Sequence, residues 1–168
     1  MSFDGIAVDY VKAELTEIQS DSLEKIAREK AKSALVKLGK PVIVEDDGLF
    51  IDVLNGFPGQ YSSYVFKTIG NAGILKLLNH SANRSAYFRS LIVFYDGQNM
   101  SISEGRAEGR ISYKITNGGW GYDPIFIPSG TDLTFAQLND KKGQYSHRKK
   151  ALETFARWYL NMISNTTI

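Results

Sequence analysis

A short apolar strand that leads into three carboxylates constrains the fold of this chain more than any other stretch. Residues 42–61 read Val-Ile-Val-Glu-Asp-Asp-Gly-Leu-Phe-Ile-Asp-Val-Leu-Asn-Gly-Phe-Pro-Gly-Gln-Tyr. The three β-formers behind Pro41 predict a buried strand. In open α/β sheets, ligands bind beyond the carboxyl ends of strands, and Glu45, Asp46 and Asp47 are expected at such an end.

Two interpretations of these carboxylates stay open from the segment alone. Adjacent carboxylates repel one another, so a folded protein gives them a cation or a proton, and a hard-metal site on oxygen ligands would do so. The other interpretation is a plain turn. Asp-Gly is a strong hairpin signal, and Asp47-Gly48 lies between Val44 and Leu49.

Length and composition exclude several other classes. A chain of 168 residues suits one domain with a sizeable core, and a net charge of +2 is too small to argue for bulk nucleic-acid binding. The absence of cysteine excludes disulfides and thiolate zinc sites, and two histidines exclude a histidine-rich metal site. Without a signal-peptide pattern or an apolar run of about 20 residues, a cytoplasmic location and no membrane partner are expected.

Hydrophobic periodicity predicts an α/β fold with a mixed, twisted central sheet and flanking helices. A helix is expected from Asp21 or Ser22 to Leu38, because a polar cap precedes its apolar stripe and Gly39 ends it. The other expected strands cover residues 5–15, 42–44, 49–54, 85–95, 100–112 and 125–127, and the other helices cover residues 62–69, 72–78, 135–138 and 146–163.

A glycine-rich aromatic loop, Gly-Gly-Trp-Gly-Tyr-Asp-Pro at residues 118–124, is the second unusual segment. Trp120 between glycines has little support from neighbouring side chains. Its ring either packs into the core or forms a stacking platform for a flat ligand. From the loop alone, core packing is the favoured interpretation.

The third unusual segment is Ser146-His147-Arg148 at the expected start of the last helix. A helix N-terminus favours an anion or an electron-rich carbonyl, although a plain Ser cap with exposed neighbours is favoured from the segment alone. The three segments together suit one ligand: Mg²⁺ with a polyphosphate, a stacked nucleobase and an arginine that only donates. That donor predicts a 6-oxo purine rather than adenine.

The sequence resembles the inosine triphosphate pyrophosphatase family (Ham1-like). The resemblance covers nearly the whole chain in order. It rests on Val-Ile-Val-Glu-Asp-Asp-Gly-Leu with Asn-Gly-Phe-Pro-Gly-Gln-Tyr-Ser, on Trp-Gly-Tyr-Asp-Pro at 120–124, on Phe135-Ala136, and on Lys142 four residues before Ser-His-Arg. It implies hydrolysis of ITP, dITP and XTP between the α- and β-phosphates, giving the monophosphate and pyrophosphate.

The resemblance also implies roles for individual residues. Asp46 resembles the general base and, with Glu17, a ligand of Mg²⁺. Lys30, which alone would be expected to be solvated, resembles a lysine that faces the phosphates. The remaining substrate contacts implied by the family are Asp47, Trp120, Gly121, Tyr122, Asp123, Lys142, His147 and Arg148. No role is implied for Glu45.

The family further implies one domain over residues 1–168 with two lobes around a substrate cleft, and a homodimer. One departure stands out: the family's N-terminal strand and its Thr/Ser-x-Asn-x-x-Lys phosphate loop have no counterpart in the sequence. Two alternatives therefore stay beside the active purine enzyme. One is a nucleotide-binding relic with weak or no turnover, and the other is a related enzyme for pyrimidine or modified bases.

Overall fold

Two compact units make up the chain in the computed structural model, which describes residues 2–3 and 6–166. Unit 1 comprises Met1–Asp46, Leu91–Gly105 and Arg148–Ile168, and unit 2 comprises Asp47–Ser90 and Arg106–His147. Three long strands run through both units. They are β3 (Val42–Ile51), β5 (Ser85–Tyr95) and β6 (Met100–Ile111).

The central sheet has five strands in the order β4-β3-β5-β6-β7, in which β4 is Pro58–Gly59 and β7 is Phe126–Pro128. Both short outer strands pair antiparallel with their neighbours, with Leu49 opposite Gly59 and Gly109 opposite Pro128. The predicted α/β class, a central sheet with flanking helices, is confirmed. The sheet is antiparallel, where the sequence predicted a mixed one.

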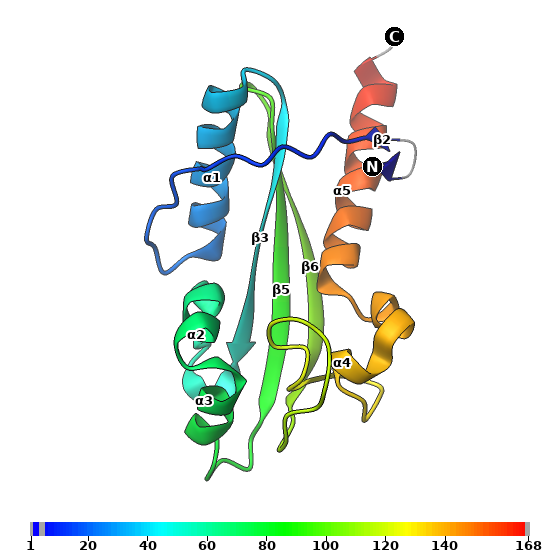
Figure 1. The fold of residues 1–168 in the computed structure, drawn as a ribbon. Helices are drawn as coiled ribbons and strands as arrows, with labels where there is room; N and C mark the ends of the chain where they lie inside the picture. The colour runs from blue at the N-terminus through cyan, green and yellow to red at the C-terminus, as the bar shows by residue number, and fades with distance from the viewer. Residues whose placement is uncertain (1, 4–5, 167–168) are drawn as a thin grey trace. The chain divides into compact units, whose positions relative to one another are not determined.

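Unit 1 places two helices beside its strands. Helix α1 (Leu23–Leu38) begins where Ser22 Oγ accepts the Lys25 N–H at 3.2 Å, and it ends at Gly39 with φ +64°. Helix α5 (His147–Thr166) packs on β5 through a cluster of Ile92, Phe94, Ala151 and Phe155. Figure 1 shows α1 and α5 on either side of the unit 1 strands.

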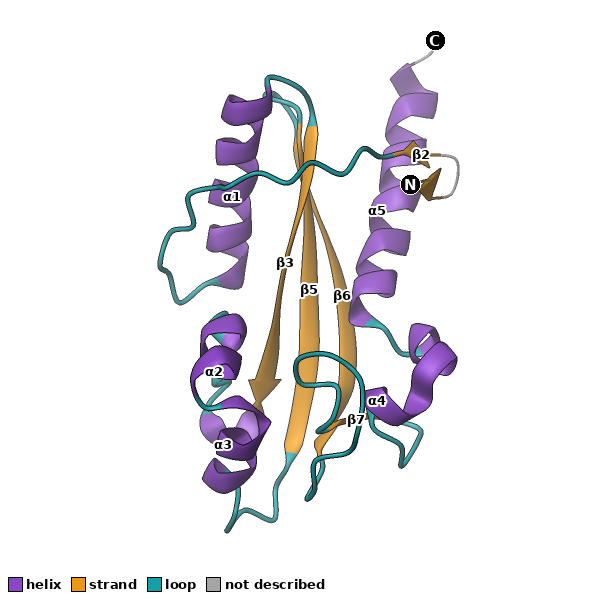
Figure 2. Ribbon diagram, viewed as in Figure 1, coloured by secondary structure: helices purple, strands orange, loops and turns teal. Residues whose placement is uncertain are grey.

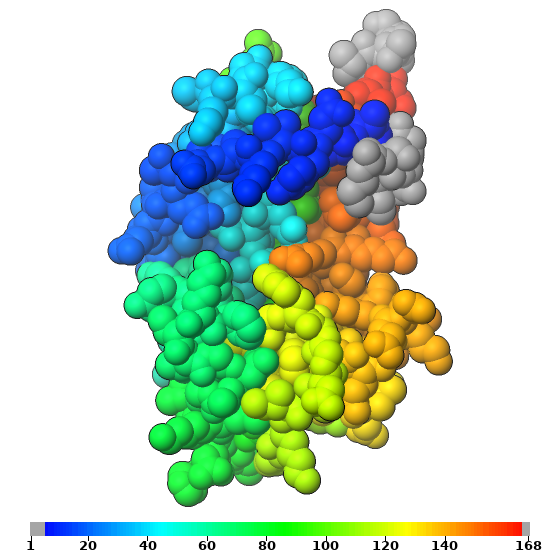
Figure 3. All heavy atoms as spheres, viewed as in Figure 1, coloured from blue at the N-terminus to red at the C-terminus, as the bar shows by residue number. Residues whose placement is uncertain are grey.

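The segment before α1 corrects one prediction. A strand was expected over residues 5–15, but the described strand residues there are only Ile6–Ala7 (β2), which pair with Ser2–Phe3 (β1); Gly5 lies outside the described residues. Residues 8–22 form an irregular segment over the surface of unit 1 (Figures 2 and 3). Side chains of α1 hold it, since Lys37 Nζ donates to the Glu14 carbonyl at 2.8 Å.

Strand β3 corrects a second prediction. The sequence predicted a strand end or a turn at the carboxylates, but β3 continues from Val42 through Glu45, Asp46, Asp47 and Gly48 to Ile51. Gly48 is needed for close approach rather than for a turn, because a Cβ there would overlap the Gly59 carbonyl of β4. The carboxylates therefore lie within a strand, whose successive side chains point to opposite faces.

Unit 2 contains an apolar core, which gathers side chains from its strands and from α2 (Ser62–Thr68), α3 (Gly70–Leu77) and α4 (Phe135–Leu138). Short 3₁₀ turns occur at Asp52–Leu54 and Asn139–Gln144. The largest fully buried side chains of this core include Phe126, Phe135, Leu49, Ile51 and Ile74. This core supports the aromatic loop between β6 and β7.

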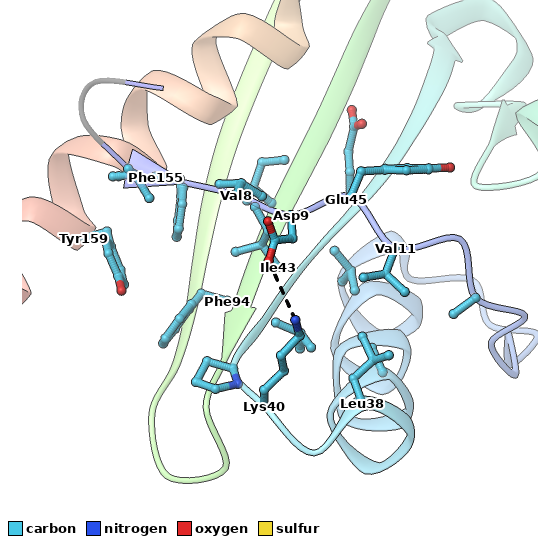
Figure 4. Close-up of a pocket in the computed structure, with 18 of the residues that line it drawn as sticks. Val8, Asp9, Val11, Leu38, Lys40, Ile43, Glu45, Phe94, Phe155 and Tyr159 are labelled. Atoms are coloured by element: carbon cyan, nitrogen blue, oxygen red, sulfur yellow. Dashed lines mark ion pairs between the residues drawn. The ribbon is translucent and has the colours of Figure 1, made fainter. Parts of the chain in front are cut away.

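A cavity of about 640 Å³ lies in unit 1 beneath the irregular segment. Figure 4 shows Phe94, Phe155 and Tyr159 on one side of it and Lys40 extended toward Asp9. Of the predicted site region only Glu45, which had no assigned role, lines this cavity. This cavity therefore does not coincide with the predicted chemistry.

Within the described part of the chain, the longest apolar helical stretch falls short of what a bilayer crossing requires.

Candidate functional site

One lysine joins the two carboxylates that the sequence assigned to a metal. Lys30 Nζ, on α1, lies 2.5 Å from Glu17 Oε1 and 3.3 Å from Asp46 Oδ2. Its side chain is only 14% exposed, so the expectation of a solvated lysine is wrong. Unit 1 thus brings together Glu17, Lys30 and Asp46, which are 13 and 16 residues apart in sequence.

The electrostatics of this triad favour the charged forms. Burial by itself disfavours the ammonium, but the hydrogen bond to Glu17 and the charges of Asp46 and Glu17 outweigh it and raise the pKa of Lys30. The ammonium therefore stays charged near neutral pH. It neutralises two carboxylates that would otherwise repel one another.

Glu45 has a partner that sequence reasoning did not foresee. Arg148 Nε, in the first turn of α5, donates to Glu45 Oε1 at 2.7 Å. Because Glu45 and Asp46 are neighbours in a strand, their side chains point to opposite faces, which explains why one meets α5 and the other meets α1. Arg148, predicted as a base contact, is engaged by Glu45 in this structure.

Asp47 and His147 come together in unit 2, where Asp47 Oδ2 lies 3.4 Å from His147 Nε2. The imidazole is 6% exposed and stacks on Phe88 with ring centres 4.6 Å apart. Its Nδ1 is buried and has no hydrogen-bond partner among the described residues. His147 is therefore a buried, ring-stacked group with one nitrogen left for a ligand or water, rather than the exposed polar residue expected from the helix start alone.

Trp120 is exposed, which overturns the core-packing interpretation. Its side chain is 72% accessible, and its loop is held through the backbone. The Trp120 N–H donates to Asp123 Oδ2 at 3.0 Å, and the Asp123 N–H donates to the Trp120 carbonyl at 3.0 Å. Gly119 has φ +73°, and a Cβ there would collide with Asp123, so glycine is required. A large ring is thus presented on a tight, well-anchored turn.

The neighbours of Trp120 form a connected cluster in unit 2. Lys142 Nζ contacts both Asp123 carboxylate oxygens, at 2.8 and 2.6 Å, and lies 5.1 Å from the centre of the Phe135 ring. The Tyr122 hydroxyl donates to the Ser62 carbonyl at 2.8 Å, and burial raises the pKa of Tyr122. Asp123 and Tyr122 therefore build the loop. Gly121, with φ +59°, offers its backbone.

Two residues that bind backbone carbonyls of unit 2 were missed from the sequence, and one of them holds this loop. Arg84, 6% exposed, donates to the carbonyls of Leu78, Ile111 and Ser112 at 3.0, 2.8 and 2.7 Å. Asn71 Nδ2 donates to the Gly121 carbonyl at 3.0 Å. Neither carries a sequence signal, because an arginine after a loop and an asparagine after a glycine are ordinary surface patterns.

The donor set of unit 1 fits a divalent metal with further ligands. Glu17 and Asp46 offer hard carboxylate oxygens that already meet at one cationic atom, Lys30 Nζ. Among the described residues there is no group of three or more His, Asp or Glu side chains placed for a metal. Mg²⁺ binds in this way, with one or two carboxylates while water and phosphate oxygens complete its shell.

Comparison with known proteins decides the family. A sequence model of the Ham1 family matches residues 3–158. The chain belongs to the Ham1 family. Among similar proteins, one from Methanopyrus kandleri named dITP/XTP pyrophosphatase is 52% identical over 163 residues, covering 95% of this chain and 87% of that protein. One of the same name from Thermococcus kodakarensis is 46% identical over 156 residues, covering 92% and 84%.

Solved structures of Ham1 proteins share the fold. The Staphylococcus aureus Ham1 protein matches with a TM-score of 0.81 and 30% identity, covering 89% of this chain and 82% of that one. A HAM1 protein from Coxiella burnetii matches with a TM-score of 0.79 and 28% identity, covering 88% and 82%. The resemblance that the motifs indicated is confirmed.

Proposed function

We propose that this Ham1-family chain is a pyrophosphatase that converts ITP, dITP and XTP to the nucleoside monophosphate and pyrophosphate. The observation that carries the proposal is the contact of Lys30 with both Glu17 and Asp46, which gathers a cation and two hard ligands at one point of unit 1. Relatives named dITP/XTP pyrophosphatase at 52% and 46% identity support the same activity. A triphosphate chain needs such a combination of positive charge and metal ligands.

The polyphosphate end of the substrate is assigned to the Lys30 triad. Glu17 and Asp46 would hold Mg²⁺, which when bound offsets phosphate charge and makes a bound water more acidic. Lys30 places a buried positive charge beside them. It offsets negative charge on the phosphates and on the leaving pyrophosphate.

The proton is assigned to Asp46. A water oxygen bonds to the α-phosphorus while the bond from that phosphorus to the α–β bridging oxygen breaks. Pyrophosphate leaves with the bridging oxygen, and Asp46 takes a proton from the attacking water. Lys30 Nζ lies 3.3 Å from Asp46 Oδ2, so it places a positive charge beside the carboxylate that would act as the general base.

The base end of the substrate is assigned to unit 2. The exposed Trp120 ring offers a stacking surface, and such stacking accepts any flat base. Selection of a 6-oxo purine then requires donors and acceptors. His147 has a buried nitrogen without a partner among the described residues, and Lys142 lies beside the loop on Asp123. Arg148 takes part in base binding only if it leaves Glu45.

The test is product identification over a substrate panel. Purified chain with Mg²⁺ is given dITP, ITP, XTP, dATP and dUTP, and phosphate is measured with and without added inorganic pyrophosphatase. We expect signal from the three deaminated purines only, and only when inorganic pyrophosphatase is present. Orthophosphate without it would show cleavage at the γ-phosphate, and a preference for dUTP would favour the pyrimidine alternative.

Several finer features stay predictions from the sequence. These are dependence on Mg²⁺, a cytoplasmic location, a homodimer and a substrate cleft. Metal dependence is measured by activity and nucleotide binding after chelation, and the homodimer by light scattering. The inactive-relic alternative has no support among relatives at 41–52% identity that carry the pyrophosphatase name.

A further inference from the structure

The Trp120 turn is held on both sides of the exposed ring, and each side uses a different element. On the N-terminal side, Asp123 Oδ2 accepts the Trp120 N–H at 3.0 Å. On the C-terminal side, Asn71 Nδ2 donates to the Gly121 carbonyl at 3.0 Å. The peptide before Trp120 is therefore fixed by the Asp123 carboxylate, and the peptide that follows Gly121 is fixed by a helix side chain.

Asn71 is well placed to fix a loop that lies 50 residues further along the chain. It is the second residue of α3, directly after Gly70, whose φ of +60° turns the chain between α2 and α3. Gly121 itself has φ +59°, and a Cβ there would meet nothing within 4 Å. An added side chain at Gly121 would find open space, so the hydrogen bond from Asn71 constrains the Gly121 peptide at a place where no side chain could pack it.

The other polar atom of the Asn71 amide has no such contact within the described part of the chain. Asn71 Oδ1 is buried and has no hydrogen-bond partner among the described residues. A buried unpaired acceptor destabilises a protein. Flipping the amide would not help, because it would put Oδ1 against the Gly121 carbonyl, two acceptors facing each other. The Asn71 amide thus pairs its nitrogen with the Gly121 carbonyl, while its oxygen has no partner among the described residues.

We propose that Asn71 is a positioning residue for base recognition, which acts by fixing the Gly121 peptide so that the Trp120 ring is presented ready for stacking. The inference rests on the proposed function, in which Trp120 binds the base. A ring on a pre-ordered turn loses less freedom when the base arrives, and that freedom is part of what binding costs. Asn71 touches neither the phosphates nor the reacting atoms, so its effect falls on substrate binding.

The experiment compares Asn71→Ala and Asn71→Asp with the wild type, with dITP as substrate. Loss of one hydrogen bond predicts a rise in KM of roughly 3- to 10-fold for Asn71→Ala, with kcat unchanged. Asn71→Asp replaces the donor by an oxygen that faces the Gly121 carbonyl, so its KM rises further. The matched control is Lys76→Ala, an exposed change on the same helix, which leaves KM unchanged.

Two further readouts separate positioning from a structural role. Asn71→Ala removes one paired donor and one unpaired acceptor together, so its melting temperature stays close to that of the wild type. The chain has two tryptophans, so Trp158→Phe makes Trp120 the sole indole reporter. In that background dITP changes the emission of Trp120, and Asn71→Ala shifts the titration to higher dITP.

The results that overturn the inference are distinct from those that overturn the activity. A KM for Asn71→Ala within twofold of the wild-type value removes Asn71 from base recognition. The inference also fails if Asn71→Ala and Asn71→Asp lose activity equally and both have a lowered melting temperature. If the wild type releases no pyrophosphate yet Trp120 reports dITP binding that Asn71→Ala weakens, the positioning role stands and the proposed reaction fails.

Discussion

Asp46→Asn is the sharpest test of the assignment of Asp46, because it keeps the shape of the side chain and removes its charge. The Asp46 side chain is 19% exposed, and its Oδ2 lies 3.3 Å from Lys30 Nζ. An amide oxygen still accepts a hydrogen bond from that ammonium. It accepts a proton far less readily than a carboxylate does, and it is a weaker metal ligand.

The expected losses differ greatly between activity and stability. Removal of a general base costs roughly 10²- to 10⁴-fold in turnover. Stranding a buried charge costs about 3–5 kcal/mol, but Lys30 keeps Glu17 at 2.5 Å, so its charge is not stranded. We therefore expect Asp46→Asn to lower the free energy of unfolding by only about 1 kcal/mol.

The measurement pairs pyrophosphate release from dITP with urea unfolding followed by circular dichroism. The matched control is Asp132→Asn. Asp132 is an exposed carboxylate that pairs with Arg110 Nη2 at 2.6 Å in unit 2, and its replacement leaves turnover unchanged. Both variants lose one carboxylate charge and an ion pair with a basic side chain, so the control shows what that loss alone does to turnover.

Turnover of Asp46→Asn within tenfold of the wild type would refute the role of Asp46 as base. A stability loss of about 3–5 kcal/mol would instead show that Asp46 is the structural counter-charge of Lys30 and that Glu17 does not compensate. With such a stability loss the variant would be partly unfolded, so even a complete loss of turnover would not identify Asp46 as the general base.

Three further predictions follow from single contacts. Trp120→Ala raises KM for dITP by roughly 5- to 150-fold, because base stacking contributes about 1–3 kcal/mol. It leaves the melting temperature nearly unchanged because the ring is exposed, and an unchanged KM contradicts the stacking role of Trp120. Lys30→Met lowers the free energy of unfolding most below pH 10.5 and less above it. The pKa of Lys30 is raised in the folded state, so its charged form stabilises the fold until the pH passes the folded-state pKa. A difference in unfolding free energy between variant and wild type that is constant across about pH 8–12 contradicts this. Arg84→Met removes hydrogen bonds to three carbonyls, of which the Leu78 carbonyl keeps another donor, the Ser81 N–H. We expect it to lower the free energy of unfolding by about 3 kcal/mol, measured by urea unfolding. Arg110→Met is the exposed control, and a loss equal to that of the control contradicts the prediction.

The elements that local signals determine were predicted well from the sequence. Helix α1 has its cap at Ser22 and its left-handed end at Gly39, as the polar cap and the glycine indicated. Strand β5 occupies Ser85–Tyr95 and helix α4 occupies Phe135–Leu138, the residues expected from periodicity. In these segments the chain conformation follows from residues within a few positions of one another.

The elements that depend on distant partners were predicted poorly. Residues 8–15 have enough alternation to suggest a strand, but they form an irregular segment that side chains of α1 hold. The loop that carries the exposed Trp120 is held by Asp123 in the loop itself and by Asn71 from α3. A glycine-flanked tryptophan has the same local sequence whether its ring is buried or exposed, so the sequence could not decide between the two.

The three adjacent carboxylates show why a strand was mistaken for a strand end. The short apolar run before Glu45-Asp46-Asp47 and the turn signal at Asp47-Gly48 predicted that the strand stops. Charged residues can stay inside a sheet strand when each has a partner. The structure gives each one a separate basic partner: Arg148 for Glu45 at 2.7 Å, Lys30 for Asp46 at 3.3 Å and His147 for Asp47 at 3.4 Å. Two of these partners lie about 100 residues away and one lies on the preceding helix, which no local pattern reveals. Of the three, only the partner of Asp46 also holds Glu17, and this shared lysine is the physical reason to assign the metal and the base to Asp46 rather than to its neighbours.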